Sequence, residues 1–326
     1  MSSKDNISYA AKTFIIGGLA GCSAKTVVAP LDRVKILFQT RNPDFERYIG
    51  VRFGMFKAGK DIFRKYGIMG LFRGHSMQLA RIYPYAAIKF MMFEQIRKIL
   101  IPTPDKNTNF RHFLSGAGAG VLSVFFTYPF DMIRVRMAYE TPKDNSGATR
   151  ARKMARIIYN EGANSLKLLN FYRGFVMSVV GMIPYGGVSF LTHNFFVTLG
   201  KTKFADIAVL PKKETSGSGG LLAGKRNKHR KTELRAWAEL TAGGLSGVFA
   251  QTCSYPFELV RRRLQVSGSN NPEKKIKMIQ VAKSIYSTQG FGGFFVGLTI
   301  GYVKVLPMFA VSFYTYAKLK SFLDIE

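Results

Sequence analysis

Three short segments of the sequence repeat one pattern: PLDRVK at residues 30–35, PFDMIR at 129–134 and PFELVR at 256–261. Each segment has a proline, any residue, an acid, two further residues and a base. A glycine that begins a Gly-x-x-x-Gly motif stands 13 residues before each proline, and a second proline follows at 54, 55 and 51 residues. These are Gly17, Gly116 and Gly243, and Pro84, Pro184 and Pro307. The fixed offsets indicate one unit of about 100 residues used three times.

The composition leaves two classes of protein open. Lys and Arg exceed Asp and Glu by 29, yet 47% of the 326 residues are hydrophobic. The 28 Phe and 15 Tyr exclude a disordered basic tail, and two cysteines, Cys22 and Cys253, are too few for a disulfide scaffold. A basic nucleic-acid binder and a membrane protein with positively charged loops remain.

The distribution of charge favours the membrane protein. Stretches 113–130, 174–192 and 240–257 carry no charge, whereas 10–38, 75–100 and 298–322 are apolar but interrupted by Lys or Arg. A membrane-spanning helix needs about 20 mostly apolar residues. Charges inside such spans usually face a water-filled cavity, so six spans of this kind indicate a transporter or channel. A nucleic-acid binder would instead gather its charge on one face of a soluble fold.

Each unit is expected to contain the same parts. A first helix has a glycine-rich early half, where a neighbouring helix can approach closely, and a proline that bends it. A basic amphipathic stretch follows, around 52–65, 149–160 and 275–288, and is expected to lie at the membrane surface. A second span then carries the second proline.

The threefold proline–acid–base pattern resembles that of the mitochondrial carrier family. The resemblance covers nearly the whole chain. The segments PLDRVKILFQ (30–39) and LFRGHSMQLARIYPYAAIKF (71–90) look most like the coenzyme A and Graves-disease-type carriers. The resemblance implies an all-α membrane protein with six transmembrane helices in three tandem repeats. It also implies pseudo-threefold symmetry and short surface helices on the matrix side. The repeats would be residues 1–104, 105–201 and 235–326.

Residues 202–234 do not fit the repeats. They are basic, contain SGSGG and are expected to form a flexible loop on the cytosolic side. This loop is either an electrostatic funnel or lipid contact, or a tolerated insertion, and the sequence favours the insertion.

The resemblance also implies two gates. On the matrix side Asp32, Asp131 and Glu258 would pair with Arg134, Arg261 and Lys35, with Gln39 and Gln265 bracing two of the pairs. Ala138 occupies the third brace position. On the cytosolic side, Glu94 is the single acid at the positions where the family has one in each repeat, and Lys320 is a base there. The cytosolic gate is therefore expected to be held closed only weakly, by at most one good ion pair.

The substrate site is expected just before the second prolines. Arg81, Gly181 and Lys304 stand three residues before them, and Met182 is next to Gly181. Lys25 breaks the repeat, because Val124 and Gln251 occupy its equivalent positions. In the family, a glycine followed by an aliphatic residue accompanies adenine-containing substrates. Arg and Lys suit phosphate groups, so the resemblance implies a phosphorylated nucleotide.

The expected function is transport of coenzyme A, or a related adenine nucleotide such as adenosine 3′,5′-diphosphate, across the mitochondrial inner membrane by alternating access. An ATP/ADP-type or other adenine-nucleotide carrier is the alternative, and peroxisomal residence remains open. No enzyme chemistry, metal site or cofactor is expected, since the sequence has neither a Walker A motif nor a metal-ligand spacing. The expected partners are the substrate and membrane lipid, including cardiolipin at the matrix-side helix ends, with no nucleic acid. The resemblance implies a monomer, and the sequence leaves antiport and uniport open.

Overall fold

The computed structural model describes residues 3–103, 108–140, 148–162, 166–204, 207, 235–270 and 276–322. These residues form helices and connecting turns, with no strand among them. The loop predicted at 202–234 lies outside the described residues except for 202–204 and 207.

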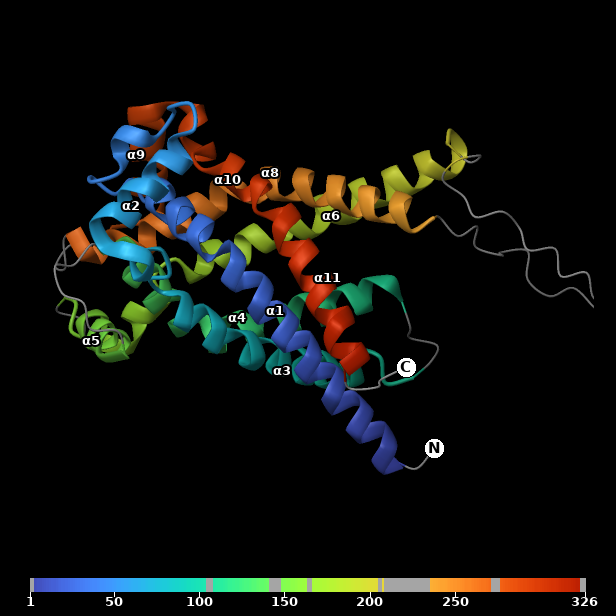
Figure 1. Cartoon of the computed structure of the whole chain (residues 1–326). Coiled ribbons are helices and arrows are strands. Elements are labelled where there is room, and N and C mark those ends of the chain that lie inside the picture. The colour runs from blue at the N-terminus through green and yellow to red at the C-terminus, as the bar shows by residue number, and fades with distance from the viewer. Residues whose placement is uncertain are drawn as a thin grey trace, which may run out of the picture. The chain divides into compact units, whose positions relative to one another are not determined.

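Six long helical segments are joined by shorter ones (Figure 1). The long segments are α1 (Ser3–Gln39), α3 (His75–Leu100), α4 (Asn109–Tyr139), α6 (Phe175–Thr202), α8 (Ala236–Asn270) and the pair α10 (Leu298–Val303) and α11 (Val305–Phe322). The short ones are η1 (Glu46–Tyr48), α2 (Gly54–Leu71), α5 (Ala148–Tyr159), η3 (Lys167–Tyr172), α9 (Met278–Gln289) and η4 (Phe291–Phe295). The helices α2, α5 and α9 coincide with the three predicted amphipathic stretches.

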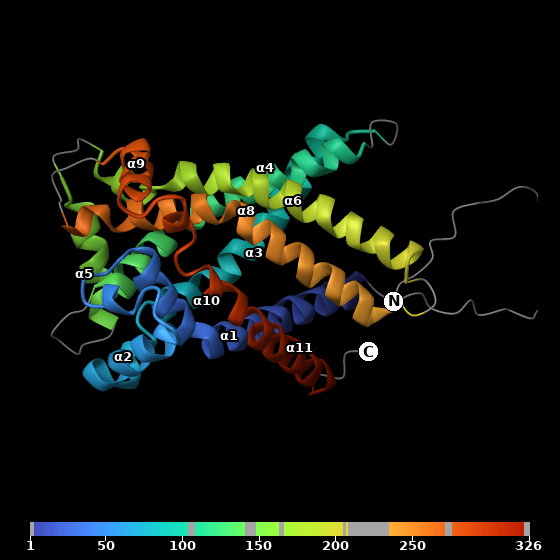
Figure 2. The ribbon, with the colours of Figure 1, turned by 90° about the horizontal axis from the view of Figure 1, so that it is seen from above.

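The chain divides into two compact units. Unit 1 comprises Met1–Val179 and Pro256–Glu326, and unit 2 comprises Val180–Tyr255. Within unit 1, α1 lies beside α11 and α3 lies beside α4 (Figures 1 and 2). Within unit 2, the last part of α6 contacts the first part of α8 through Phe196 and Phe249, whose ring centroids are 6.0 Å apart.

The prolines act differently at different places. Pro30, Pro129 and Pro256 lie inside α1, α4 and α8, and each removes one backbone hydrogen bond without ending its helix. In the sixth segment the helix is interrupted at Lys304, where α10 ends and α11 begins. Pro307 cannot donate to the carbonyl of Val303, which explains the interruption at this point.

A close approach is observed in the glycine-rich early halves of α1 and α4, but not at the first glycine of either Gly-x-x-x-Gly motif. A Cβ on Gly17 or Gly116 would meet no heavy atom of the described residues within 4 Å. The tight contacts are made by other glycines: a Cβ on Gly18 would overlap the Tyr83 ring, and one on Gly118 would lie 3.1 Å from Ile96. Helix rotation decides which face meets the neighbour, and glycine spacing alone does not determine that rotation.

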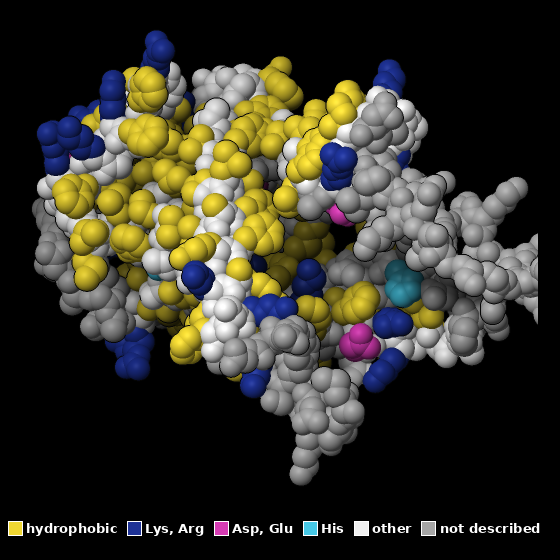
Figure 3. Space-filling view, turned by 45° about the vertical axis from the view of Figure 1, so that its right-hand side comes forward, with side chains coloured by type: hydrophobic (Ala, Val, Ile, Leu, Met, Phe, Trp, Pro, Cys, Tyr) yellow, Lys and Arg dark blue, Asp and Glu magenta, His cyan; other side chains and the backbone are white. Residues whose placement is uncertain are grey.

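The helix exteriors are apolar. Within the part of the chain that the structure describes, four segments are long and apolar enough to cross a membrane: Lys12–Gln39, Phe110–Tyr139, Lys167–Thr202 and Phe291–Phe322. Exposed aromatic and aliphatic residues occur on the long helices, for example Phe90 on α3 and Phe313 on α11, and Figure 3 shows apolar side chains over much of the face in view. Such an exterior is unfavourable in water and suits helices surrounded by lipid.

Candidate functional site

The three proline segments supply a ring of ion pairs inside unit 1. Lys35 Nζ lies 2.9 Å from Glu258 Oε1, Arg134 Nη2 lies 3.0 Å from Asp32 Oδ2, and Arg261 Nη2 lies 2.5 Å from Asp131 Oδ2. We call these six residues the signature network. Each pair joins two of the helices α1, α4 and α8, because the acid and the base of one segment bond to different neighbours.

Two glutamines one turn beyond the bases add hydrogen bonds. Gln39 Nε2 donates to Glu258 Oε1 over 3.2 Å, and Gln265 Nε2 donates to Asp131 Oδ2 over 3.0 Å. These are the two brace positions that the resemblance implied. Gln265 also donates to the hydroxyl of the buried Tyr128, whose ring faces the Arg261 guanidinium 5.1 Å away.

The third pair is supported from another helix. Ala138 takes the place of a glutamine in the second repeat, and Gln78 on α3 donates instead to Asp32 Oδ2 over 3.2 Å. Gln78 was not predicted. It lies three residues before Arg81 and therefore on the same face of α3, which is a signal that the sequence offered.

Two of the predicted substrate-binding cations bond to the network itself. Lys304 Nζ lies 2.8 Å from Asp32 Oδ1, and Arg81 Nη1 lies 3.3 Å from Asp131 Oδ1. Arg81 also donates to the Thr127 hydroxyl and covers the ring of Tyr85. The acids that pair with Arg81 and Lys304 lie on neighbouring helices, and the sequence did not indicate these two ion pairs.

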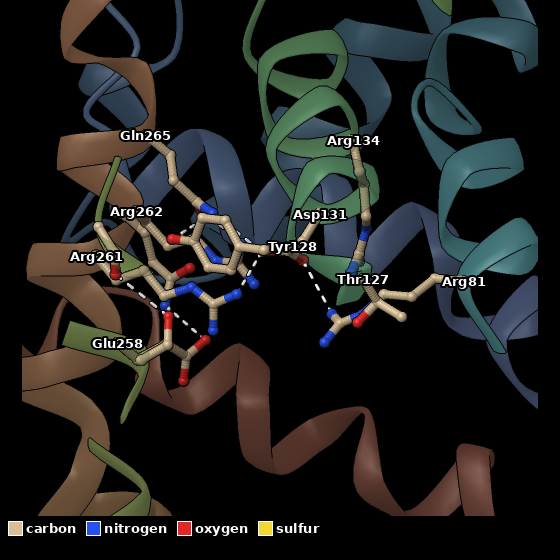
Figure 4. A network of polar contacts seen from close by, with 12 residues as sticks. Arg81, Thr127, Tyr128, Asp131, Arg134, Glu258, Arg261, Arg262 and Gln265 are labelled. Carbon is tan, nitrogen blue, oxygen red and sulfur yellow. Dashed lines mark hydrogen bonds and ion pairs between the residues drawn. The ribbon is translucent and has the colours of Figure 1, made fainter. Parts of the chain in front are cut away.

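Arg262 also bonds to the signature network, although no motif of the sequence indicated it. Its Nη1 lies 3.0 Å from Asp131 Oδ2 and donates to Gln265 Oε1 over 2.9 Å. Figure 4 shows Asp131 between Arg261 and Arg262 on one side and Arg81 on the other. One buried carboxylate is therefore shared by three guanidinium groups.

The family model described as mitochondrial carrier protein matches three successive parts of the chain: residues 7–103, 105–203 and 232–325. The chain belongs to the mitochondrial carrier family. Members of this family are transporters, and the carrier's three matched parts each contain one proline–acid–base segment.

Similar carriers are found in distant organisms. "Mitochondrial carrier protein LEU5" of Saccharomyces cerevisiae is 43% identical over 334 residues, which cover 97% of this chain and 91% of the relative. "Solute carrier family 25 member 16" of Homo sapiens is 35% identical over 98% of the chain and 90% of its own length. "Mitochondrial adenine nucleotide transporter ADNT1" of Arabidopsis thaliana is 32% identical over 97% of this chain and 88% of its own length.

The other predicted residues of the carrier are placed as follows. Lys25 Nζ contacts Met308 Sδ over 3.3 Å on α11. Gly181 and Met182 lie on α6 in unit 2, both partly buried, and their role stays a prediction. Glu94 pairs weakly with Arg97 of its own helix, at 3.8 Å, and no ion pair joins Glu94 to Lys320 among the described residues.

A second buried ion cluster lies in the second repeat. Arg136 and Arg173 both bond Glu161 Oε2, at 2.8 and 3.0 Å, and Arg136 is fully buried. The equivalents of Arg136 and Glu161 in the first repeat are Leu37 and Tyr66, so this cluster has no counterpart there. The cluster links α4 to the turn before α6. We interpret its role as structural, because both arginines form ion pairs with the Glu161 carboxylate.

Proposed function

We propose that the carrier moves coenzyme A, or a related adenine nucleotide such as adenosine 3′,5′-diphosphate, across the mitochondrial inner membrane by alternating access. The observation that carries the proposal is the charge of the ion-paired network. Its three acids are Asp32, Asp131 and Glu258, and its cations are Lys35, Arg81, Arg134, Arg261, Arg262 and Lys304. The excess of three positive charges suits a polyanion.

Coenzyme A has the complementary chemistry. It carries a 3′-phosphate and a diphosphate, and these groups match Arg81 and Lys304, which stand at the predicted contact positions. Arginine can hold phosphate with two parallel hydrogen bonds, whereas lysine acts as a point charge. Lys25 lies near enough to interact electrostatically with Lys304, so a phosphate group would also relieve repulsion between the two lysines.

The same contacts explain how binding would open the signature network. A phosphate that pairs with Arg81 and Lys304 removes one cationic partner from Asp131 and one from Asp32. A buried carboxylate with fewer partners is costly, so the closed network becomes less stable while substrate is bound. A ligand shifts an equilibrium by its differential affinity for two states, and here that difference arises at the acids themselves.

Uptake into liposomes containing the purified protein tests the proposal. The labelled compounds are coenzyme A, adenosine 3′,5′-diphosphate, ADP and ATP. Saturable uptake of coenzyme A that adenosine 3′,5′-diphosphate inhibits is the expected result. Uptake of ADP or ATP alone would replace coenzyme A by the alternative, an ATP/ADP-type carrier, which the name of the Arabidopsis thaliana relative favours. Absence of uptake for all four compounds would reject a nucleotide substrate.

A further inference from the structure

The three network acids differ in what their second oxygen contacts. Asp131 Oδ1 bonds Arg81 and Asp32 Oδ1 bonds Lys304, while the other oxygen of each acid bonds its network base. In Glu258, Oε1 accepts from both Lys35 and Gln39. Its Oε2 has no hydrogen-bond partner among the described residues. Glu258 is thus the one acid of the three with an unused acceptor there.

Glu258 also differs from the other two acids in the solvent exposure of its side chain. Its side chain is 28% exposed, against 1% for Asp131 and 7% for Asp32. Glutamate is also one methylene longer than the aspartates at the equivalent positions of the first two repeats. The side chain of Glu258 is therefore the most exposed of the three acids.

The repeat register gives a reason for the unused oxygen. Arg81 of the first repeat forms an ion pair with Asp131, the acid of the second repeat. Lys304 of the third repeat forms an ion pair with Asp32, the acid of the first repeat. The equivalent position of the second repeat is 181. That position is a glycine, which has no side chain to offer.

The surrounding charges limit what can bind to this oxygen. Lys35, Arg262 and Lys304 all interact electrostatically with Glu258. A metal ion or an ammonium group would be repelled by these three cations, and they also oppose protonation of the carboxyl. A neutral N–H group can donate to the oxygen without adding charge, so it is the favoured partner.

We propose that Glu258 Oε2 accepts a hydrogen bond from the exocyclic amino group of the substrate's adenine, and so selects adenine over other bases. The inference rests on the proposed function, since it requires a nucleotide whose phosphates bind Arg81 and Lys304. A base with a carbonyl oxygen in place of the amino group would point lone pairs at the negative carboxylate. Such a base should therefore bind more weakly. A base that lacks the amino group loses this hydrogen bond to a charged acceptor.

The test compares ligands that differ in this one group. Adenosine, purine riboside and inosine 3′,5′-diphosphates compete for uptake of labelled adenosine 3′,5′-diphosphate into liposomes holding the full-length protein. Removal of the amino group should weaken inhibition about tenfold or more, the lower range for a hydrogen bond to a charged group. Inosine should inhibit more weakly still.

Two variants locate the effect. Glu258→Asp keeps the charge and matches the aspartates of the other repeats, but withdraws Oε2. It should reduce the preference for adenosine over purine riboside to about threefold or less. The matched control Gln39→Ala removes the donor to the other oxygen, Oε1. It should slow transport and leave the base preference unchanged, because Oε2 stays in place.

Equal inhibition by adenosine and purine riboside in the unaltered protein would overturn the inference but keep the proposed function, since both nucleotides would still bind. Full base preference in Glu258→Asp would overturn it as well. Failure of all three nucleotides, with no uptake of coenzyme A, would reject the proposed function and the inference together. If Glu258→Asp does not fold, the comparison in the unaltered protein decides alone.

Discussion

Exchanging the charges of an ion pair should restore the stability of the protein for the Lys35–Glu258 pair, but not for the Asp131–Arg261 pair. The two double variants are Lys35→Glu with Glu258→Lys, and Asp131→Arg with Arg261→Asp. Both restore one ion pair with its charges exchanged. They differ in the surroundings of the acid. Lys35 alone forms an ion pair with Glu258 among the described residues, whereas Arg81, Arg261 and Arg262 all form ion pairs with Asp131.

The magnitude follows from these contacts. Arg81 and Arg262 lie 3.3 and 3.0 Å from the oxygens of Asp131. Like charges about 4 Å apart repel by about 4 kcal/mol at an effective dielectric of 20. An arginine at position 131 would meet two such charges, and their repulsion exceeds the gain from the one restored pair. A lysine at position 258 would also be repelled by Arg261, Arg262 and Lys304. None of these three forms an ion pair with Glu258 among the described residues, so the restored pair should prevail.

The assay is thermal denaturation of the purified proteins in detergent, with both double variants and all four single reversals. Stability is the readout because Glu258 is also proposed to contact substrate, which would confuse an uptake measurement. The 35/258 double variant should be clearly more stable than either of its single variants. The 131/261 double variant should be no more stable than the better of its singles. Equal recovery by both doubles would refute the reasoning that extra cations decide the outcome.

Three other outcomes follow from single residues. Arg81→Ala and Lys304→Ala should each abolish uptake of the substrate while the protein remains folded, because each removes a phosphate partner; normal uptake by either variant would reject the site. Gln78→Ala should lower the stability of the protein by about 1.5 kcal/mol or more, measured by thermal denaturation in detergent, since it removes a hydrogen bond to a buried carboxylate; an unchanged midpoint would show that Arg134 and Lys304 suffice. Gly74→Ala should cost about 1–2 kcal/mol or more, because φ is +80° and the new Cβ would lie 2.6 Å from a backbone oxygen. Gly116→Ala is its control, has open space and should not destabilise the protein.

Much of the architecture could be predicted from the sequence because it is encoded locally and repeated. The proline–acid–base segments fixed the register of the three units, and the basic amphipathic stretches coincide with α2, α5 and α9. The bases that pair with each acid could be named from the family pattern before any distance was known. Local spacing was less informative about helix rotation, as the open space at Gly17 shows.

The partners of the remaining polar groups were decided by tertiary structure. Gln78, Arg262 and the ion pairs of Arg81 and Lys304 depend on which side chains three separate helices bring within about 3 Å of one carboxylate, a range set by hydrogen-bond geometry. Residues 46 or more positions apart make these contacts, and no periodicity in the sequence encodes them. The sequence alone determined that this chain is a threefold helical carrier with acids and bases at bent helices. Only the packing of those helices decided that each acid has a different set of partners among the described residues.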